Sequence, residues 1–378
     1  MSKIGVSSTS LADPRAAAGQ LVTEARAGLT AQPALAVLFA TADYDTQALV
    51  AGVSAALEGV PVWGGSSASG VFANDRWVTG EKGAAALMLI ADRKAGAALQ
   101  PVGADAVQAG AAAAEAALRQ AGGQASALLT LAYMGPEEAL LQGVAQAAPK
   151  VPVVGGSASD GAGRFQQFGR GQVLTEAVTL AALGGPVGYA FAHGYRPTGK
   201  TARVTRAQGR RILELDGRPA LAVYGGWTGA AEAEINGGAI LTYSVFHPLL
   251  RHLNGDTLAI HPVAANPDGS IDTGAAMAEG LTLELGLGTL DELIAAVAPV
   301  VRQAAQTVKK PAAVLLSHCG GRAIGLGGRI AEVAGQVRQA VGAVPWIGYL
   351  AFGEQGCLGP GRNAHANLSL SALVLGEV

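Results

Sequence analysis

The chain has 378 residues, with 26 lysines and arginines against 28 aspartates and glutamates, and a formal net charge of −2. This balance excludes the strongly basic domain typical of nucleic-acid binding, and 50% hydrophobic residues exclude a mainly disordered chain. No apolar run reaches the roughly 18 residues of a membrane-spanning helix, the N-terminus lacks the apolar segment of a secretory signal, and two cysteines cannot form a disulfide framework. We therefore expect a cytoplasmic protein with no nucleic-acid and no membrane partner.

Three segments share one order of elements: an apolar strand, a helix, and a second strand that starts at Val-Pro. They end in VPVWGGSSASG at Val60–Gly70, VPVVGGSASDG at Val151–Gly161 and VPWIGYLAFGE at Val344–Glu354. Continuous apolar strands indicate sheets covered on both faces, and self-similarity of this kind indicates duplicated units. The stretches that follow, GAAALMLI, AVTLAALGG and ANLSLSALVL, alternate and predict antiparallel strands. We predict a mixed α/β (α+β) fold of duplicated β-α-β units with mixed sheets, in two related domains.

The stretch between the second and third units has a different pattern. Residues 202–205 and 212–215 flank a Gln208-Gly209 turn and predict a hairpin, and Asp216-Gly217 is a second turn signal. Residues 221–238 are glycine-rich and loop-like. We place a boundary there, which gives domains 1–225 and 226–378.

Residues 194–201, GYRPTGKT, match the spacing of a phosphate-binding loop. That loop needs a helix that starts at the Lys-Thr pair, because the helix N-terminus binds the phosphates. The residues after Thr201 instead alternate like a strand. We interpret the match as a turn before a hairpin with Lys200 in solvent, and a nucleotide switch is the disfavoured alternative.

Two Gly-Gly-Ser turns are candidate ligand-binding sites, with Ser66 and Ser157 as their polar side chains. Consecutive backbone N–H groups in a glycine-rich turn can hold an anion such as a carboxylate. The structural alternative is a turn whose serine satisfies its own backbone.

A second candidate site follows the first strand of the third unit, at Cys319-Gly-Gly-Arg322. Ligands of open α/β sheets bind at the carboxyl ends of strands, and Arg322 can hold a carboxylate through two parallel bonds. Cys319 is a nucleophile only if a base lowers its thiol pKa. His318 is a poor base because neighbouring side chains on a strand face opposite ways, so His365 or Glu354 would have to serve. A buried, inert Cys319 is the alternative.

Glu354 and Asn367 complete the candidate set in the third unit. Glu354 can receive an ammonium group, and Asn367 can both donate and accept hydrogen bonds. With Arg322 they would suit a zwitterion, whereas each alone is equally compatible with a loop or turn. The scattered histidines and the absence of C-x-x-C predict no metal site, and we predict no cofactor.

With these motifs the chain resembles the FIST family, which pairs FIST N and FIST C domains. Two segments are similar to the N-terminal family pattern, namely VPVWGGSSASG and GYRPTGKTARVTRAQGRRILELDGRPAL. Three segments are similar to the C-terminal family pattern, namely Cys319–Arg322, Gly353-Glu354 and Asn367–Leu370. The resemblance implies a FIST N-like domain over 1–225, a FIST C-like domain over 226–378, and a bacterial sensory module for small ligands such as amino acids. The two domains use the whole chain, so the resemblance implies output through a signalling partner or an oligomer change.

The leading hypothesis is therefore a cytoplasmic sensory protein that binds an amino acid or a related small carboxylate and is not an enzyme. The predicted ligand-binding residues are Ser66, Ser157, Cys319, Arg322, Glu354 and Asn367. The alternative is a Cys319-dependent enzyme, with His365 as base, that acts on an amide or an amino-acid-like substrate.

Overall fold

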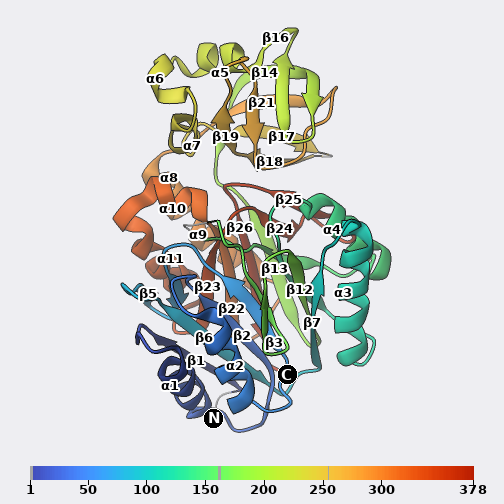
Figure 1. The fold of residues 1–378 in the computed structure, drawn as a ribbon, viewed down its shortest axis with the longest axis vertical. Coiled ribbons are helices and arrows are strands. Elements are labelled where there is room, and N and C mark those ends of the chain that lie inside the picture. The colour runs from blue at the N-terminus through green and yellow to red at the C-terminus, as the bar shows by residue number, and fades with distance from the viewer. Residues whose placement is uncertain (1–2, 161–162, 254) are drawn as a thin grey trace.

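The chain folds into a large body with a smaller lobe above it (Figure 1). The computed structural model describes residues 3–160, 163–253 and 255–378. Met1, Ser2 and Gly161, the last residue of the second predicted motif, lie outside the described residues. The body comprises residues up to the end of β13 (Val187–Ala192) and from α8 (Leu290–Ala295) onward, and the upper lobe lies between them in sequence.

The body consists of three copies of one pattern, β-α-β-α-β-β-β-β. The first copy comprises β1 (Ile4–Thr9), α1 (Pro14–Arg26), β2 (Pro33–Ala40), α2 (Thr46–Ala56), β3 (Val62–Ser66), β4 (Val71–Ala73), β5 (Arg76–Val78) and β6 (Ala85–Ala91). The second comprises β7 (Ala95–Pro101), α3 (Ala106–Gln120), β8 (Ala127–Ala132), α4 (Glu137–Ala147), β9 (Val153–Ser157), β10 (Gln167–Gly169), β11 (Gln172–Leu174) and β12 (Ala177–Leu183). The third follows the same pattern with additional helices: β13, then α8 and α9 (Val297–Ala305), β22 (Pro311–Cys319), then α10 (Gly320–Leu326), the 3-10 helix Gly327–Ala331 and α11 (Glu332–Val341), followed by β23 (Trp346–Ala351), β24 (Glu354–Cys357), β25 (Asn363–Ala366) and β26 (Leu370–Gly376).

The predicted β-α-β units are confirmed in all three copies. The strands of each unit pair in parallel, β2 with β3, β8 with β9 and β22 with β23. The predicted antiparallel strands are β6, β12 and β26, and each pairs with the first strand of its unit. In the third copy the helix α10 directly follows Cys319 and carries the glycine-rich segment.

The three copies are interlocked by an exchange of hairpins. The β10–β11 hairpin of the second copy extends the sheet of the first through β3, and the β24–β25 hairpin extends the sheet of the second through β9. The β4–β5 hairpin of the first copy extends the sheet of the third through β23. This closed exchange makes the body one unit, since no copy completes its own sheet.

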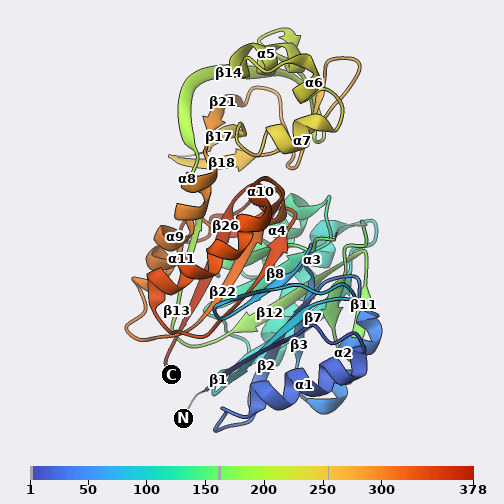
Figure 2. The same cartoon turned by 90° about the vertical axis from the view of Figure 1, so that its left-hand side faces the viewer.

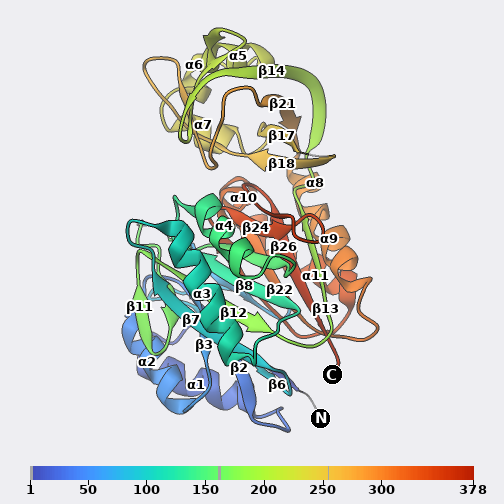
Figure 3. The ribbon, with the colours of Figure 1, turned by 90° about the vertical axis from the view of Figure 1, so that its right-hand side faces the viewer.

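The inner faces of the three sheets share one apolar core. Phe39 of the first copy stacks on Tyr349 of the third, with ring centroids 4.3 Å apart. Trp63 of the first copy donates from Nε1 to the carbonyl oxygen of Thr179 of the second, at 3.1 Å. Separate apolar clusters pack the helices on the outer faces (Figures 2 and 3). Apolar side chains from all three copies are therefore buried together, and their burial stabilises the centre of the body.

The Gly-Gly-Ser glycines allow two strands to approach closely. A Cβ on Gly155 would lie 1.9 Å from the carbonyl oxygen of Thr130, and one on Gly64 would lie 1.7 Å from that of Leu38. These oxygens belong to the paired strands β8 and β2 and cannot move independently. The close approach that the sequence suggested for a ligand is made here by a neighbouring strand.

Gly155→Ala is expected to lower the free energy of unfolding by about 1–3 kcal/mol, because the added methyl group forces the two strands apart. Urea denaturation followed by circular dichroism measures this loss. Gly335→Ala is the matched control, since Gly335 is exposed on α11 and a Cβ added there would meet no atom within 4 Å. A similar loss in both variants would show that the strand contact is not the cause.

In its described residues the upper lobe is an antiparallel β-sheet with three short helices and its own apolar core. It comprises β14 (Arg196–Gln208), β15 (Arg211–Leu215), β16 (Arg218–Pro219), α5 (Ala220–Thr228), α6 (Glu232–Ile235), α7 (Ala239–Tyr243), β17 (Leu249–Leu253), β18 (Asp256–Ile260), β19 (Pro262–Ala265), β20 (Ile271–Thr273) and β21 (Thr282–Leu287). The predicted hairpin is confirmed, with Gln208 paired to Arg211. The Asp216-Gly217 turn is also confirmed, and both residues have positive φ, 49° and 72°.

The segment 221–238 is largely helical, so its prediction as a loop was wrong. Ala220, Val223 and Tyr224 of α5 are buried at helical spacing, which outweighs the low helix propensity of the glycines. The predicted boundary between residues 225 and 226 falls inside α5, and the lobe itself extends on both sides of it. The sequence pattern divides the chain into two consecutive halves, whereas in the structure the upper lobe is inserted between the first and second elements of the third copy.

Residues 194–201 do not form a phosphate-binding loop with a following helix. Arg196–Thr201 is the first part of strand β14, and the Thr198 hydroxyl donates to the carbonyl oxygen of Leu285 at 2.8 Å. The Lys200 ammonium group is exposed and donates to the carbonyl oxygen of Trp227.

No helix in the described part of the chain is long and apolar enough to cross a bilayer.

Candidate functional site

A cavity of about 430 Å³ lies where the upper lobe meets the body. The body contributes Met134, Gly135, Phe165, Cys319, Gly321, Ile324, Phe352, Gly353 and Asn367, and the upper lobe contributes Arg210, Leu241, His261, Val263, Thr273 and Gly274. Its size is within the range of small-molecule sites, which also tend to lie between domains. The cavity is therefore the candidate functional site.

The strand order of the body explains why these residues meet. Met134 follows β8, Cys319 ends β22 and Phe352 follows β23, so all three lie at the carboxyl ends of parallel strands. The second and third copies are joined there by the pairing of β24 with β9. Phe165 and Phe352, one from each copy, make an edge-to-face contact at 6.1 Å. This arrangement gives the body side of the cavity an aromatic wall.

Asn367 joins the two lobes beside the cavity. Its Nδ2 donates to the carbonyl oxygen of Gly274 at 3.1 Å, and its Oδ1 accepts from the backbone N–H of His261 at 3.2 Å. A Cβ on Gly274 would lie 2.6 Å from the Asn367 amide, so only glycine allows this approach. The side chain predicted to contact a ligand is thus a cavity-lining residue whose hydrogen bonds go to the upper lobe.

Arg210 is the one charged residue among the described residues that line the cavity, and the sequence reasoning missed it. It lies in the β14–β15 turn of the upper lobe and forms ion pairs with Glu137, at 2.6 Å, and Glu138, at 2.8 Å, at the start of α4. Glu137 is fully buried and also accepts from the Ser157 hydroxyl at 2.9 Å. Burial raises the pKa of Glu138, but the nearby His365 and Arg210 together with hydrogen bonds from the backbone N–H groups of Ala276 and Glu138 outweigh this effect and keep that pKa below its usual range.

The predicted serines lie near the cavity but outside its lining. Ser66 is fully buried and its hydroxyl accepts from the backbone N–H of Gln166 at 3.0 Å. Ser157 is also fully buried, and its hydroxyl is bonded to Glu137 and to Gln355. Ser157 thus orients the carboxylate that holds Arg210.

Cys319 lines the cavity, yet its surroundings disfavour the thiolate. Burial and the nearby Glu354 carboxyl raise the pKa of the thiol far above its usual range. His318 points elsewhere: its Nδ1 lies 3.0 Å from the Cys319 carbonyl oxygen, and burial lowers its pKa to about 3. The His365 ring lies against Gln355 and Gly274, at 3.3 and 3.1 Å. Of the two candidate bases, only Glu354 lies next to Cys319. The Cys319-dependent enzyme therefore stays a hypothesis, with Glu354 rather than His365 beside the thiol.

The thiol of Cys319 is expected to react with iodoacetamide at pH 7 at least tenfold more slowly than in the unfolded protein, because it is protonated and almost wholly buried. Mass spectrometry of the Cys319 peptide measures the rate, with the same peptide in guanidinium chloride as the control. A folded-state rate equal to that of an exposed thiol would revive the enzyme hypothesis.

Arg322 does not line the cavity. It is fully buried, and its two terminal nitrogens donate to the carbonyl oxygens of His193, at 3.0 Å, and Leu293. Its guanidinium is thereby occupied by the protein backbone. A direct bond from Arg322 to a ligand carboxylate would require those two bonds to break.

Glu354 also lies behind the cavity wall, next to Cys319. Its Oε2 accepts from the backbone N–H of Ser369 at 2.9 Å. Burial raises the pKa of this carboxyl to about 8, so it is mainly neutral at pH 7. A neutral acid is not the counter-ion for an ammonium group that the sequence suggested. Of the six predicted ligand-binding residues, Cys319 and Asn367 line the cavity, and the other four lie around it.

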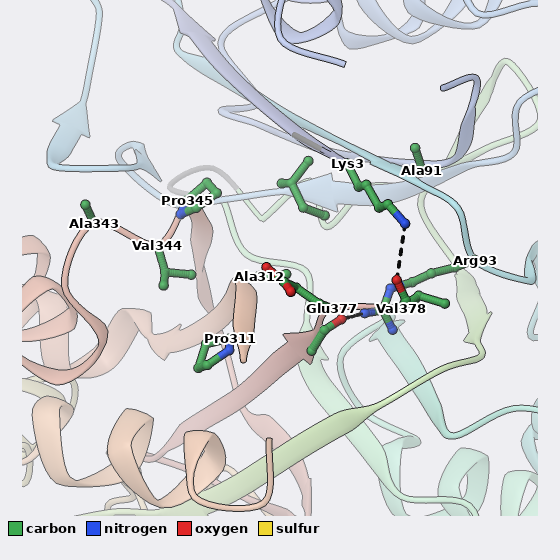
Figure 4. A pocket seen from close by; sticks show the side chains of 12 residues that line it. Lys3, Ala91, Arg93, Pro311, Ala312, Ala343, Val344, Pro345, Glu377 and Val378 are labelled. Atoms are coloured by element: carbon green, nitrogen blue, oxygen red, sulfur yellow. Dashed lines mark hydrogen bonds between the residues drawn. The ribbon is translucent and has the colours of Figure 1, made fainter. Parts of the chain in front are cut away.

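A second cavity, of about 680 Å³, is lined by residues at both ends of the described chain, including Lys3 and Val378 (Figure 4). Both described termini lie at the end of the body away from the upper lobe (Figure 1). The cations of this cavity are already engaged: Arg93 donates to the carbonyl oxygens of Gly184 and Gly376, and Lys3 to that of Val378. Because none of the predicted site residues lies there, we do not assign it a function.

Comparison with known proteins identifies two adjacent family domains. The FIST N domain matches residues 34–218, and the FIST C domain matches residues 220–357. The uncharacterized protein Rv0628c of Mycobacterium tuberculosis is 28% identical over 378 residues, 96% of each chain. The uncharacterized protein Mb0898c of Mycobacterium bovis is 30% identical over 63% of this chain and 64% of its own. The uncharacterized protein MJ1623 of Methanocaldococcus jannaschii is 37% identical over 78 residues. The chain spans less than two thirds of the last two relatives, 64% and 15%.

Proposed function

Since the chain belongs to the FIST family, whose domains are recognised as sensory domains in signalling, we propose that it senses an apolar amino acid bound in the cavity between the lobes. The observation that carries this proposal is an apolar cavity with a charged lining residue, Arg210, that is flanked by two carboxylates. A cytoplasmic location and a signalling partner for the output, both expected from the sequence, are part of the proposal.

The cavity walls support an apolar side chain on the ligand. The body contributes three apolar side chains to the cavity wall, those of Phe165, Phe352 and Ile324. The upper lobe contributes those of Leu241 and Val263. Burying an aliphatic or aromatic side chain against them contributes about 25 cal/mol per Å² of apolar area. Charged or short polar amino acids would lose hydration there without gaining partners.

The charges around Arg210 support a zwitterion rather than a plain carboxylate. Arg210 already faces Glu137 and Glu138, so a ligand with only a negative charge would add to an excess of carboxylates. An amino acid brings both charges: its carboxylate bonds to Arg210, and its ammonium group bonds to Glu138, whose side chain is one third exposed. The predicted class of amino acid or small carboxylate is thus narrowed to the amino acid.

The test is thermal unfolding with leucine, methionine and phenylalanine, beside 4-methylpentanoate, which lacks the ammonium group, and isoamylamine, which lacks the carboxylate. A ligand at a hundredfold excess over Kd stabilises the folded state by about 2.7 kcal/mol. We expect stabilisation by the amino acids alone. Absence of any shift with all three amino acids would refute the proposal, and a shift with 4-methylpentanoate alone would refute the zwitterion.

Ile324→Trp supplies the variant for that test. Ile324 is 48% exposed and lines the cavity, so a larger side chain fills the entrance without disturbing the core. We expect the amino-acid shift to disappear. Leu253→Trp is the matched control, because Leu253 is 38% exposed on the upper lobe and does not line the cavity.

A further inference from the structure

Two chain crossings join the lobes, and both run along the same side of the molecule. The first passes from β13 through His193, Gly194 and Tyr195 into β14, and the second passes from β21 into α8. Figures 2 and 3 show α8 and the start of β14 at one edge, with α10 and then α4 farther across the interface. Helix α4, whose Glu137 and Glu138 pair with Arg210, thus lies farther from the crossings than α10 does.

The two crossings pack against each other without space. A Cβ on Gly194 would lie 2.5 Å from that of Ala296, and one on Gly288 would lie 2.8 Å from the Tyr195 ring. Arg196 of the first crossing forms an ion pair with Glu292 of the second at 2.9 Å. The crossings therefore form one hinge unit and not two independent linkers.

Arg322 binds this unit from the body. One guanidinium nitrogen donates to the carbonyl oxygen of His193, in the first crossing, and another to that of Leu293, in the second. The side chain is fully buried, so these charge-assisted bonds are not shared with solvent. Loss of the guanidinium would leave both carbonyl groups without this partner.

The short helix that carries Arg322 also forms part of the cavity wall. Gly321 and Ile324 of α10 line the cavity, as does Cys319 immediately before it. At Gly325 the same helix approaches the upper lobe, where a Cβ would lie 2.6 Å from Val245. A displacement of α10 therefore changes the cavity, the hinge and the contact with the upper lobe together.

We propose that Arg322 is a positioning residue that clamps the hinge between the lobes and, through α10, transmits occupation of the cavity to their relative position. The clamp itself follows from the contacts above; the response to a ligand rests on the proposed function. Arg322 need not touch the ligand in this scheme, which accounts for its place behind the cavity wall.

The experiment measures the distance between spin labels at Arg218→Cys, exposed in the upper lobe, and Glu115→Cys, exposed on α3. Cys319 and Cys357 are buried, and the parent without the two new cysteines is the blank. Arg322→Met is compared with Arg338→Met, because Arg338 is an exposed arginine of α11 whose partner, Asp75, belongs to the body. Leucine is the probe ligand, and all measurements are made well below the unfolding temperature.

We expect Arg322→Met to broaden the distance distribution without ligand and to weaken leucine binding at least tenfold, while Arg338→Met resembles the parent. In the parent, leucine is expected to narrow the distribution. If Arg322→Met leaves both the distribution and the affinity unchanged, the clamp is refuted. If the parent binds no leucine but Arg322→Met still broadens the distribution, the clamp holds and the proposed ligand fails.

Arg322→Lys covers the case in which the methionine variant does not fold. Lysine keeps the charge but presents a single ammonium group, which lacks the planar fork that spans two carbonyl oxygens. A broadened distribution in folded Arg322→Lys supports the clamp, and a distribution identical to that of the parent overturns it.

Discussion

Glu354→Gln is expected to remove a fall in stability of roughly 4 kcal/mol between about pH 4.5 and pH 8. Burial raises the pKa of Glu354 from 4.5 to about 8 in the folded protein. In this pH range the folded state holds a proton that the unfolded state has released, so stability decreases as pH rises, by about 1.36 kcal/mol per pH unit. The stabilising contribution is complete below pH 4.5 and is lost once pH passes the folded pKa. Glutamine is neutral throughout and shows no such slope.

Urea denaturation at pH 5, 6, 7 and 8 tests this expectation. The slope of the difference between parent and Glu354→Gln gives the contribution of this carboxyl group directly. Glu377→Gln is the control, because that side chain is 59% exposed and should leave the profile as it is in the parent. Parallel profiles for Glu354→Gln and the parent would mean that the Glu354 carboxyl group is ionised already at pH 5, which contradicts its burial.

Arg210→Met is expected to lower the free energy of unfolding by about 3–5 kcal/mol, the usual effect of removing one partner from a buried ion pair. Glu137 is fully buried, and without Arg210 its remaining partners are the backbone N–H of Gly135 and the Ser157 hydroxyl. The same change removes the ion pair to Glu138, one of the contacts between the upper lobe and α4. Thermal and urea unfolding measure the loss.

Arg206→Met is the matched control, since Arg206 lies near the end of β14, just before the turn that holds Arg210, and pairs with Glu214 at the surface, at 3.2 Å. Exposed pairs contribute about 0–1 kcal/mol, so a small effect is expected there. The double variant Arg210→Met/Glu137→Gln should recover part of the stability, because no buried charge is left unpaired. A double variant less stable than Arg210→Met would point to a different origin for the loss.

Both predictions concern ionisable side chains that the fold buries next to the cavity. If Arg210 also receives the ligand, Arg210→Met should abolish the amino-acid shift even at a temperature where the variant is folded. Glu354→Gln should leave that shift in place, because the carboxyl group lies behind the wall and is neutral at pH 7. The two variants thus separate a ligand contact from a structural acid.

The amino-acid sequence by itself predicted the family and, in each repeated unit, the β-α-β core and the antiparallel strand that closes it; it did not predict the first strand and helix of each copy or the exchanged hairpins. Apolar runs predicted β2, β8 and β22, helical spacing predicted α2, α4 and α11, and the Gln208-Gly209 and Asp216-Gly217 signals located two turns. These strands, helices and turns depend on residues that are close together in the sequence, so short sequence patterns are enough to predict them. Where packing outweighs propensity, as in α5 with its glycines, the local pattern failed.

Only the tertiary structure decided which side chains form the cavity. The hairpin exchange brings Phe165 and Phe352 together across copies, and the upper lobe places Arg210 against Glu137. The sequence selected Arg322 and Glu354 as ligand-binding residues. It could not show that Arg322 bonds to two backbone carbonyl oxygens or that burial raises the pKa of Glu354 to about 8. Contacts between residues far apart in the chain, and the desolvation that accompanies them, depend on how the three copies and the lobe pack, which no single segment encodes.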